Sequence, residues 1–160
     1  YTKIKIEKED MDIVMLLEDL EDYLEALFKK NDIKAEFNLK DEEIYINADY
    51  NRLKQVFLNL LKNAIEAKDE TKKENKINIS LESDSKSMKI IVEDNGIGMD
   101  KDTLDNVSKM FFTTKKKGSG LGVSLSKEII EQHKGSIVYN SVKGEGTRVI
   151  VTLPKEEFVA

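Results

Sequence analysis

Residues 49–68 read DYNRLKQVFLNLLKNAIEAK, and this stretch decides the fold more clearly than any other part of the chain. Its apolar residues recur at i, i+3 and i+4, which is the spacing of one face of a helix. Asp49 stands in front of the pattern as a candidate N-cap. We therefore expect a long amphipathic helix over 49–68, with a core stripe made of Leu53, Val56, Phe57, Leu60, Leu61 and Ala64.

The segments on either side of this helix alternate between helical and strand-like patterns. Helical spacing predicts further helices over 11–30, 100–107 and 120–132, with Gly135 expected to stop the last one. Short apolar runs bounded by polar turns predict strands at 33–37, 43–47, 77–81, 88–93, 136–140 and 147–153. Because consecutive strands are joined by short turns, we expect an α/β two-layer sandwich, with a mixed, mostly antiparallel sheet and three main helices on one face.

The composition fits one globular domain and excludes several classes of function. The chain has 160 residues, of which 36% are charged, and a net charge of −5, which gives no electrostatic case for nucleic acid or for direct membrane contact. No apolar run approaches the roughly 20 residues of a membrane span. There is no cysteine, which suits a cytoplasmic, reducing location, although the parent protein could still be membrane-anchored. The chain begins at Tyr1 rather than Met, so we expect a piece of a longer protein.

Two asparagines lie one turn apart beside the core stripe of the helix over 49–68. Asn59 and Asn63 share this second stripe with Gln55 and Glu66. A solvated polar face is the ordinary interpretation of such a pair. However, asparagine lowers helix propensity without a gain in packing, and its amide oxygen is a hard, neutral ligand that suits Mg²⁺.

Three glycine-rich segments could hold a ligand, although each also has a simpler interpretation as a turn or loop. DNGIGM at 94–99 follows a strand, so Asp94 could accept a hydrogen bond from an amino group while the glycines let a flat ligand approach. GSGLG at 118–122 precedes a helix, where free amides bind anions, and Lys115, Lys116 and Lys117 stand just upstream. GEGT at 144–147 enters the last strand. None of the three has the spacing of a Rossmann or Walker A motif.

Taken together and in this order, the segments resemble the histidine-kinase branch of the ATPase superfamily that also contains gyrase, the Hsp90 chaperones and the MutL repair proteins. QVFLNLLKNAIEA resembles the N box of that family, MFFTTK its phenylalanine box, and DNGIGM, GSGLG and GEGT its three glycine boxes. The resemblance covers about residues 10–154. It implies a Bergerat-type fold in which residues 1–160 form the catalytic and ATP-binding domain, with ATP and Mg²⁺ as cofactors.

The resemblance also implies a role for each matching residue. Asn63 is the expected Mg²⁺ ligand, Asn59 supports the phosphates or a metal-bound water, and Lys115 reaches the β- and γ-phosphates, so these three are the expected catalytic residues. Asp94 would hold the adenine amino group, and Thr147 would lie near Asp94 and share a water with the adenine. A lid over about residues 100–120, anchored by Phe111 and Phe112, would cover the nucleotide. The other expected ATP-binding residues are Gly96, Ile97, Gly98, Met99, Thr113, Thr114, Gly118, Ser119, Gly120, Leu121 and Gly122.

Two positions depart from the pattern of some relatives. Asn59 stands where gyrase and Hsp90 relatives have a glutamate that activates water, and an amide cannot act as that base. The departure favours transfer to a protein acceptor over hydrolysis. Glu66 stands where some histidine kinases have a lysine or arginine that reaches the phosphates. The contacts of cationic side chains with the phosphates are therefore expected mainly from the lid lysines. This form is similar to the nitrogen-sensor and sporulation-kinase subgroups.

The single histidine of the chain does not match the family's phosphoacceptor. His133 follows the nucleotide motifs, precedes Lys134 and is expected to be a surface residue near a helix C-terminus, where the helix dipole favours it. The acceptor is therefore expected on a dimerisation hairpin upstream of residue 1, with a response regulator as the downstream partner and a monomeric isolated domain. Two alternatives stay open: a nucleotide-dependent switch without transfer, and a serine kinase of the anti-sigma type.

Overall fold

The computed structural model describes residues 4–39, 43–107 and 121–155, and for residues 121–124 it describes the backbone alone. The helices in this part of the chain are α1 (Ile13–Lys30), α2 (Tyr50–Glu66), α3 (Lys101–Asn106) and α4 (Leu121–Gln132). Its strands are β1 (Glu9–Asp12), β2 (Ile33–Asn38), β3 (Tyr45–Ala48), β4 (Asn75–Ser83), β5 (Ser87–Asp94), β6 (Ser136–Val142) and β7 (Gly146–Pro154). None of the described helices is long and apolar enough to cross a membrane.

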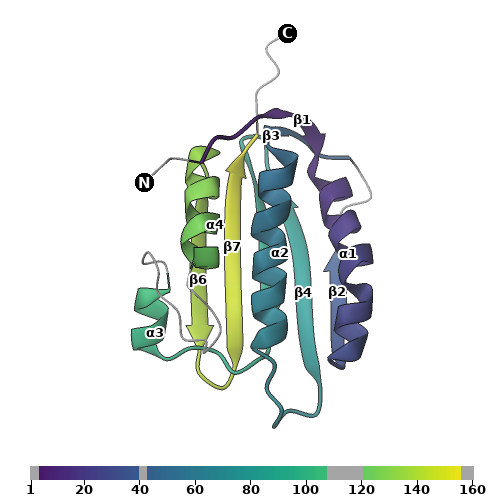
Figure 1. Cartoon of the computed structure of the whole chain (residues 1–160), viewed down its shortest axis with the longest axis vertical. Helices are drawn as coiled ribbons and strands as arrows, with labels where there is room; N and C mark the ends of the chain where they lie inside the picture. Colours follow the sequence, from purple (N-terminus) through teal and green to yellow (C-terminus); the bar gives the residue numbers. More distant parts are fainter. Residues whose placement is uncertain (1–3, 40–42, 108–120, 156–160) are drawn as a thin grey trace.

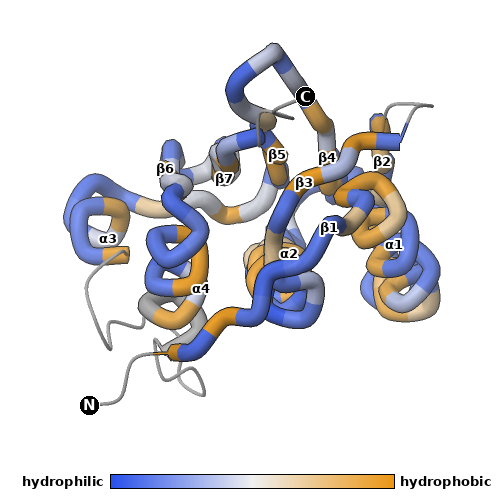
Figure 2. Tube along the Cα trace, turned by 90° about the horizontal axis from the view of Figure 1, so that it is seen from above, coloured by the Kyte–Doolittle hydropathy of each residue, from blue (hydrophilic) through white to orange (hydrophobic). Residues whose placement is uncertain are grey.

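The described strands form one large sheet and one small one. The large sheet has the order β2-β4-β5-β7-β6, in which only the β2–β4 pair is parallel. The small sheet pairs β1 with β3 in antiparallel fashion. Helices α1, α2 and α4 lie side by side over one face of the large sheet (Figure 1), and the view from above shows that its other face carries no helix (Figure 2). The predicted two-layer sandwich is confirmed.

Helix α2 occupies the centre of the helical layer because its sequence supplies both a cap and an apolar stripe. The Asp49 carboxylate accepts a 3.1 Å hydrogen bond from the backbone N–H of Arg52, which is the expected N-cap contact. All six residues of the predicted core stripe are buried, together with Ile65. They face alternate residues of the central strands, among them Ile77, Ile79, Leu81, Met88, Ile90, Val92, Val149, Val151 and Leu153.

The N-terminal part of the fold differs from the expectation. The helix predicted over 11–30 begins at Ile13, since Asp12 caps it by accepting from the backbone N–H of Val14 at 3.0 Å. The residues before the cap form β1, which the sequence analysis did not predict. The strands expected at 33–37 and 43–47 are not neighbours, because β2 pairs with β4 while β3 pairs with β1. A four-residue strand with one buried side chain, Met11, is too short for its periodicity to be recognised.

The end of α4 is also built differently from the prediction. Gly135 was expected to stop the helix, but the residue with left-handed backbone is Lys134, with φ of 60°. The amide of Gly135 donates to the carbonyl oxygen of Ile130 at 2.9 Å. A Cβ at Gly135 would lie 2.2 Å from the carbonyl oxygen of Thr152. Glycine is therefore required by the close approach of this turn to β7.

Candidate nucleotide-binding site

The predicted adenine-binding residues lie where β5 ends and β7 begins. Asp94 and Thr147 are directly paired across the two strands, so the expectation that Thr147 lies near Asp94 is confirmed. The Asp94 carboxylate is partly buried and accepts a 2.9 Å hydrogen bond from the backbone N–H of Gly96. A carboxylate offers about four lone-pair positions, and the backbone N–H groups of Gly96 and Thr147 are the donors that approach it here. Asp94 therefore keeps acceptor capacity for a ligand.

Burial and hydrogen bonding act on Asp94 in opposite directions. Loss of solvent raises the pKa of its carboxyl group above the ordinary value, whereas the N–H groups of Gly96 and Thr147 and the charge of Lys72 lower it. The net direction is upward. A partly buried acid at the end of a central strand is the kind of group expected to bind a ligand.

The first glycine segment is pressed against the C-terminal end of α2. The backbone N–H of Ile97 donates to the carbonyl oxygen of Ala67 at 2.8 Å, and a Cβ at Gly96 would lie 2.1 Å from that same oxygen. Gly98 has a φ of 65°, and a Cβ there would lie 2.1 Å from the carbonyl oxygen of Val142. These glycines thus allow the chain's own backbone segments to meet. The Ile97 side chain, expected to be a pocket wall, is 52% exposed, and Met99 is partly buried.

Ser141 joins the segments around this site, and the sequence analysis did not single it out. Its hydroxyl oxygen accepts from the backbone N–H of Met99 at 2.8 Å and donates to the carbonyl oxygen of Gly146 at 2.9 Å. It also lies 2.8 Å from the hydroxyl of Thr147. Ser141 pairs with Thr147 between β6 and β7. Its place opposite the predicted Thr147 in the hairpin is the one feature of the sequence that could have pointed to it. Together these contacts place the first and third glycine segments against each other.

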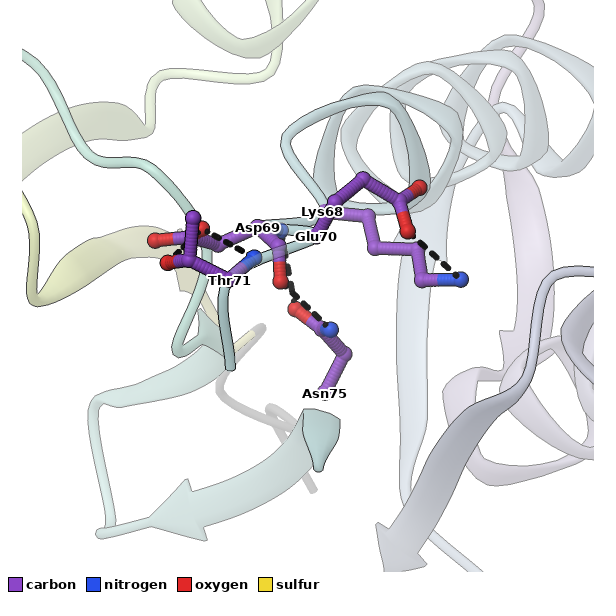
Figure 3. A network of polar contacts seen from close by, with 5 residues as sticks. All are labelled: Lys68, Asp69, Glu70, Thr71 and Asn75. Carbon is purple, nitrogen blue, oxygen red and sulfur yellow. Dashed lines mark hydrogen bonds and ion pairs between the residues drawn. The ribbon is translucent and has the colours of Figure 1, made fainter. Parts of the chain in front are cut away.

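The connection after α2 forms a compact turn on the same side of the molecule (Figure 3). The Asp69 carboxylate accepts from both the backbone N–H and the hydroxyl of Thr71, at 3.0 and 2.6 Å. The buried amide of Asn75 bonds the backbone of Asp69 in both directions, at 2.9 Å each way. Lys68 and Glu70 form an ion pair of 3.7 Å. Nearby, the Asn95 side chain donates to the Glu74 carbonyl oxygen at 2.9 Å, which fixes this turn against the first glycine segment.

Helices α2 and α4 bring the phosphate-binding candidates to the same level. The C-terminal end of α4 meets the N-terminal end of α2, where the backbone N–H of Asp49 donates to Nε2 of His133 at 3.0 Å. The two helices are therefore antiparallel. Helix α4 has 12 residues and a rise of roughly 18 Å, so its N-terminus lies level with residues 59–63 of α2. Asn59 and Asn63 are both partly buried, at the expected boundary between core and solvent.

Several predicted residues lie outside the described part of the chain. The lid expected over 100–120 is described only as far as residue 107, where α3 confirms the short helix predicted over 100–107. For Leu121 and Gly122 only the backbone is described, in the first turn of α4. The candidates outside the described residues are Phe111, Phe112, Thr113, Thr114, Lys115, Lys116, Lys117, Gly118, Ser119 and Gly120.

His133 is buried, and the prediction of a surface histidine is wrong. Its side chain is 3% exposed, and Nδ1 lies 2.7 Å from the carbonyl oxygen of Ile129. A carbonyl only accepts, so Nδ1 carries the proton while Nε2 accepts from Asp49, and the ring is neutral. Burial lowers the pKa of His133, in accord with this state. The residue is part of the helix junction and is not presented as a phosphoacceptor.

Two surface depressions are formed by described residues. The smaller, of about 240 Å³, includes Asp94, Ser141 and Thr147 in its lining. The larger, of about 430 Å³, lies between α1 and β2, and none of the predicted site residues line it. The candidate site is therefore chosen by its polar groups at the ends of β5 and β7 and not by the volume of a depression.

Comparisons with known proteins agree with this geometry. Residues 48–157 match the family described as "Histidine kinase-, DNA gyrase B-, and HSP90-like ATPase". Sporulation kinase E of Bacillus subtilis is 36% identical over 147 residues, covering 91% of this chain and 20% of the relative. Sporulation kinase A of the same organism is 35% identical over 149 residues, covering 93% of this chain and 24% of the relative. The chain thus spans only about a fifth to a quarter of the length of these curated relatives.

Solved structures give the same result. The catalytic domain of histidine kinase ThkA, in a nucleotide-free form, superposes with a TM-score of 0.82 at 30% identity, covering 94% of this chain and 99% of that one. ThkA in complex with the response regulator TrrA gives a TM-score of 0.77 at 29% identity, covering 93% of this chain and 42% of that one. The chain belongs to the histidine kinase, gyrase B and HSP90-like ATPase family and, within it, to the histidine kinase catalytic domains. Membership of this ATPase family identifies ATP as its nucleotide.

Proposed function

We propose that this domain binds Mg-ATP and transfers the γ-phosphate to a histidine on a separate dimerisation hairpin of its parent protein. One observation carries the proposal. The Asp94–Thr147 pair lies at the end of the sheet near which α4 begins, and Asn59 and Asn63 of α2 lie level with the start of α4. The described candidates for adenine and Mg²⁺ binding thus lie around the C-terminal half of α2, which supports the proposal in a chain that belongs to the histidine kinase catalytic domains.

The residues support binding of the adenine and of a phosphate-bound cation. The Asp94 carboxylate would accept a hydrogen bond from the adenine amino group, and free amides in the first turn of α4 would bind phosphate oxygens. Mg²⁺ keeps several waters and usually takes one or two protein oxygens plus substrate phosphates. The amide oxygen of Asn63, with Asn59 one turn before it, would supply the protein ligand.

In the proposed reaction, an imidazole nitrogen of the acceptor histidine forms a bond to the γ-phosphorus. The bond between that phosphorus and the β–γ bridging oxygen breaks, and ADP leaves with the electron pair. Such transfer depends mainly on positioning and on cationic groups around the phosphates. Asn59 cannot abstract a proton from water, so the site lacks at this position the base that would favour hydrolysis.

The experiment combines this chain, γ-labelled ATP with Mg²⁺, and a separately produced dimerisation hairpin of the parent protein. We expect acid-labile, base-stable label on the hairpin and none on this chain, including His133. Asn63→Asp and Asp94→Asn are each expected to remove binding or transfer. If both variants bound and transferred normally, the site assignment would be wrong.

The same experiment separates the alternatives. Acid-stable label on a serine would support a serine kinase, and tight ATP binding without any transfer would support a switch module. A response regulator is the proposed downstream partner, supported by the ThkA complex with its regulator TrrA. It is tested by adding the regulator after the hairpin has been labelled and following the label.

A further inference from the structure

Lys72 contacts the candidate site and belongs to none of the motifs recognised in the sequence. It lies in the turn between α2 and β4, whose shape is fixed by Asp69, Thr71 and Asn75 (Figure 3). Its side chain is partly buried, whereas the next residue, Lys73, is exposed. A lysine held back from solvent in this way requires an explanation, since the ammonium group is strongly hydrated.

The ammonium group of Lys72 spans the first and third glycine segments. Nζ donates to the backbone carbonyl oxygen of Asn95, to that of Gly96 at 3.2 Å, and to that of Glu145 at 3.5 Å. An ammonium has three donors, and three carbonyl oxygens approach it. Two of these belong to the segment that follows Asp94, and the third belongs to the turn that precedes Thr147. One side chain thus joins the backbone on either side of the candidate adenine site.

The sheet by itself does not hold these backbone segments. The β5–β7 ladder ends at the Asp94–Thr147 pair, so the peptide groups of residues 95–97 and 144–145 lie beyond it. One backbone hydrogen bond joins them, from the N–H of Gly144 to the carbonyl oxygen of Ile97 at 2.7 Å, and Lys72 supplies the donor for the carbonyl oxygens of Asn95, Gly96 and Glu145. The charge of Lys72 also acts on the Asp94 carboxylate, where it opposes the upward effect of burial on the pKa.

We propose that Lys72 is a positioning residue of the nucleotide site, which fixes the two glycine segments around Asp94 and keeps the Asp94 carboxylate an acceptor for the adenine amino group. The inference rests on the proposed binding of ATP. Lys72 is not a catalytic residue, because its contacts are to backbone carbonyls. Other nearby lysines do not share this arrangement: Lys68 pairs with Glu70, and Lys73 is exposed.

The test measures the dissociation constant of Mg-ATP by calorimetry for the wild-type chain and for Lys72→Met, Lys72→Arg and Lys73→Met. Loss of a charged donor to several carbonyls should weaken ATP binding by Lys72→Met roughly ten-fold. Lys72→Arg retains charge and donors and should bind within a few-fold of wild type, and Lys73→Met is the matched control with no expected change. The thermal midpoint of each variant shows that it is folded. Lys72→Gln, which keeps a donor without the charge, gives a second neutral variant.

The pH profile separates a positioning role from a merely structural one. Removing the lysine charge raises the pKa of Asp94 further, so ATP binding by Lys72→Met should fail at a higher pH than binding by wild type. A loosened fold would instead weaken binding equally at all pH values, and that result would overturn the inference, as would unchanged affinity and pH profile. If the wild-type chain failed to bind ATP, the proposed function would be wrong. If the wild-type chain bound ATP and Lys72→Met had no effect, only the role of Lys72 would be wrong.

Discussion

The two ends of helix α2 are held by polar contacts of opposite character. At the N-terminal end, Asp49 and His133 are 8% and 3% exposed and bond one another directly. The Asp49 carboxylate also accepts from the backbone N–H of Glu7 at 2.8 Å, which attaches the N-terminal segment. At the C-terminal end, the carbonyl of Ala67 and the ammonium of Lys72 hold glycine segments that remain partly open to solvent.

The difference separates a structural junction from a candidate ligand site. Most buried polar groups in proteins are hydrogen-bonded, and at the Asp49 end a neutral imidazole completes the pairing between two helices. At the Ala67 end, Asp94 is partly buried and keeps acceptor positions for a ligand, at the cost of a raised pKa. Helix α2 therefore has a fully paired, buried N-terminal end and a C-terminal end where acceptor positions stay available.

Breaking the buried junction should have the largest effect on stability. His133→Ala removes a buried ring and leaves the backbone N–H of Asp49 without its acceptor, so we expect the free energy of unfolding to fall by about 3 kcal/mol. Urea denaturation measures this change. His133→Gln is the matched control, since its amide can both accept and donate, and it should lose less. Equal losses in both variants would show that the hydrogen bonds of His133 contribute little.

At the opposite end, Gly96→Ala should lower both stability and ATP affinity. Its Cβ would lie 2.1 Å from the carbonyl oxygen of Ala67, which forces a backbone shift costing about 2 kcal/mol. Urea denaturation and ATP titration check the two effects. Gly144→Ala is the control: its φ is 84°, a conformation that Gly96 does not have, but no atom lies within 4 Å of its Cβ, so only about 1 kcal/mol of backbone strain is expected. If the two variants behaved alike, close approach would not be the reason for Gly96.

The buried histidine should also make stability depend on pH. Burial, aided by the charge of Lys8 and opposed by Asp49 and the Ile129 carbonyl, lowers the pKa of His133 below 6.5 in the folded protein. The unfolded chain then binds more protons, so stability is fully present above about pH 6.5 and is lost as the pH falls below it, by at most about 1.4 kcal/mol per pH unit. The slope of unfolding free energy against pH measures this. His133→Gln should flatten it in that window, and an unchanged slope would assign the effect to other groups.

The smallest effect on stability is expected at Tyr139 on β6, which belongs to neither end of α2. Burial raises the pKa of its hydroxyl to about 12, and among the described residues this oxygen has no hydrogen-bond partner. Tyr139→Phe therefore removes a buried polar group without breaking a bond, and the free energy of unfolding should change by less than about 1 kcal/mol or rise slightly. Thermal unfolding checks this. A large loss would reveal a partner for the hydroxyl that the described residues do not show.

The sequence predicted the elements with strong periodicity and missed those held by long-range contacts. Helix α2 and its cap were predicted nearly to the residue, because one apolar stripe and one aspartate are local signals. Strand β1 was missed, because four residues with a single buried side chain carry no recognisable period. His133 was misplaced for a related reason: a polar residue at the end of a helix usually faces solvent, and only the approach of Asp49 reveals the acceptor role of its ring.

The site shows the same division. Thr147 was expected near Asp94 from the resemblance, and the strand register, which pairs the two residues, confirms it. Ser141 and Lys72 were not expected, since each bonds the backbone of a distant segment, at Met99 for Ser141 and at Gly96 for Lys72. Backbone partners leave no trace in the identity of the residues that provide them. The predicted roles of Asn59 and Asn63, and of the candidates outside the described residues, stay predictions.

By itself, the sequence determined the family and the two-layer architecture, and it supplied the candidate ATP-binding side chains, because periodicity, capping and ordered glycine motifs depend on local residue types. Only the tertiary structure decided which glycines lie against other backbone segments and that Lys72 joins the two glycine segments. It also decided that the sole histidine is buried at a helix junction, where its ring accepts a hydrogen bond. These features depend on distances between segments far apart in the chain. Such distances are set by the packing of helices on the sheet and not by any single stretch of sequence.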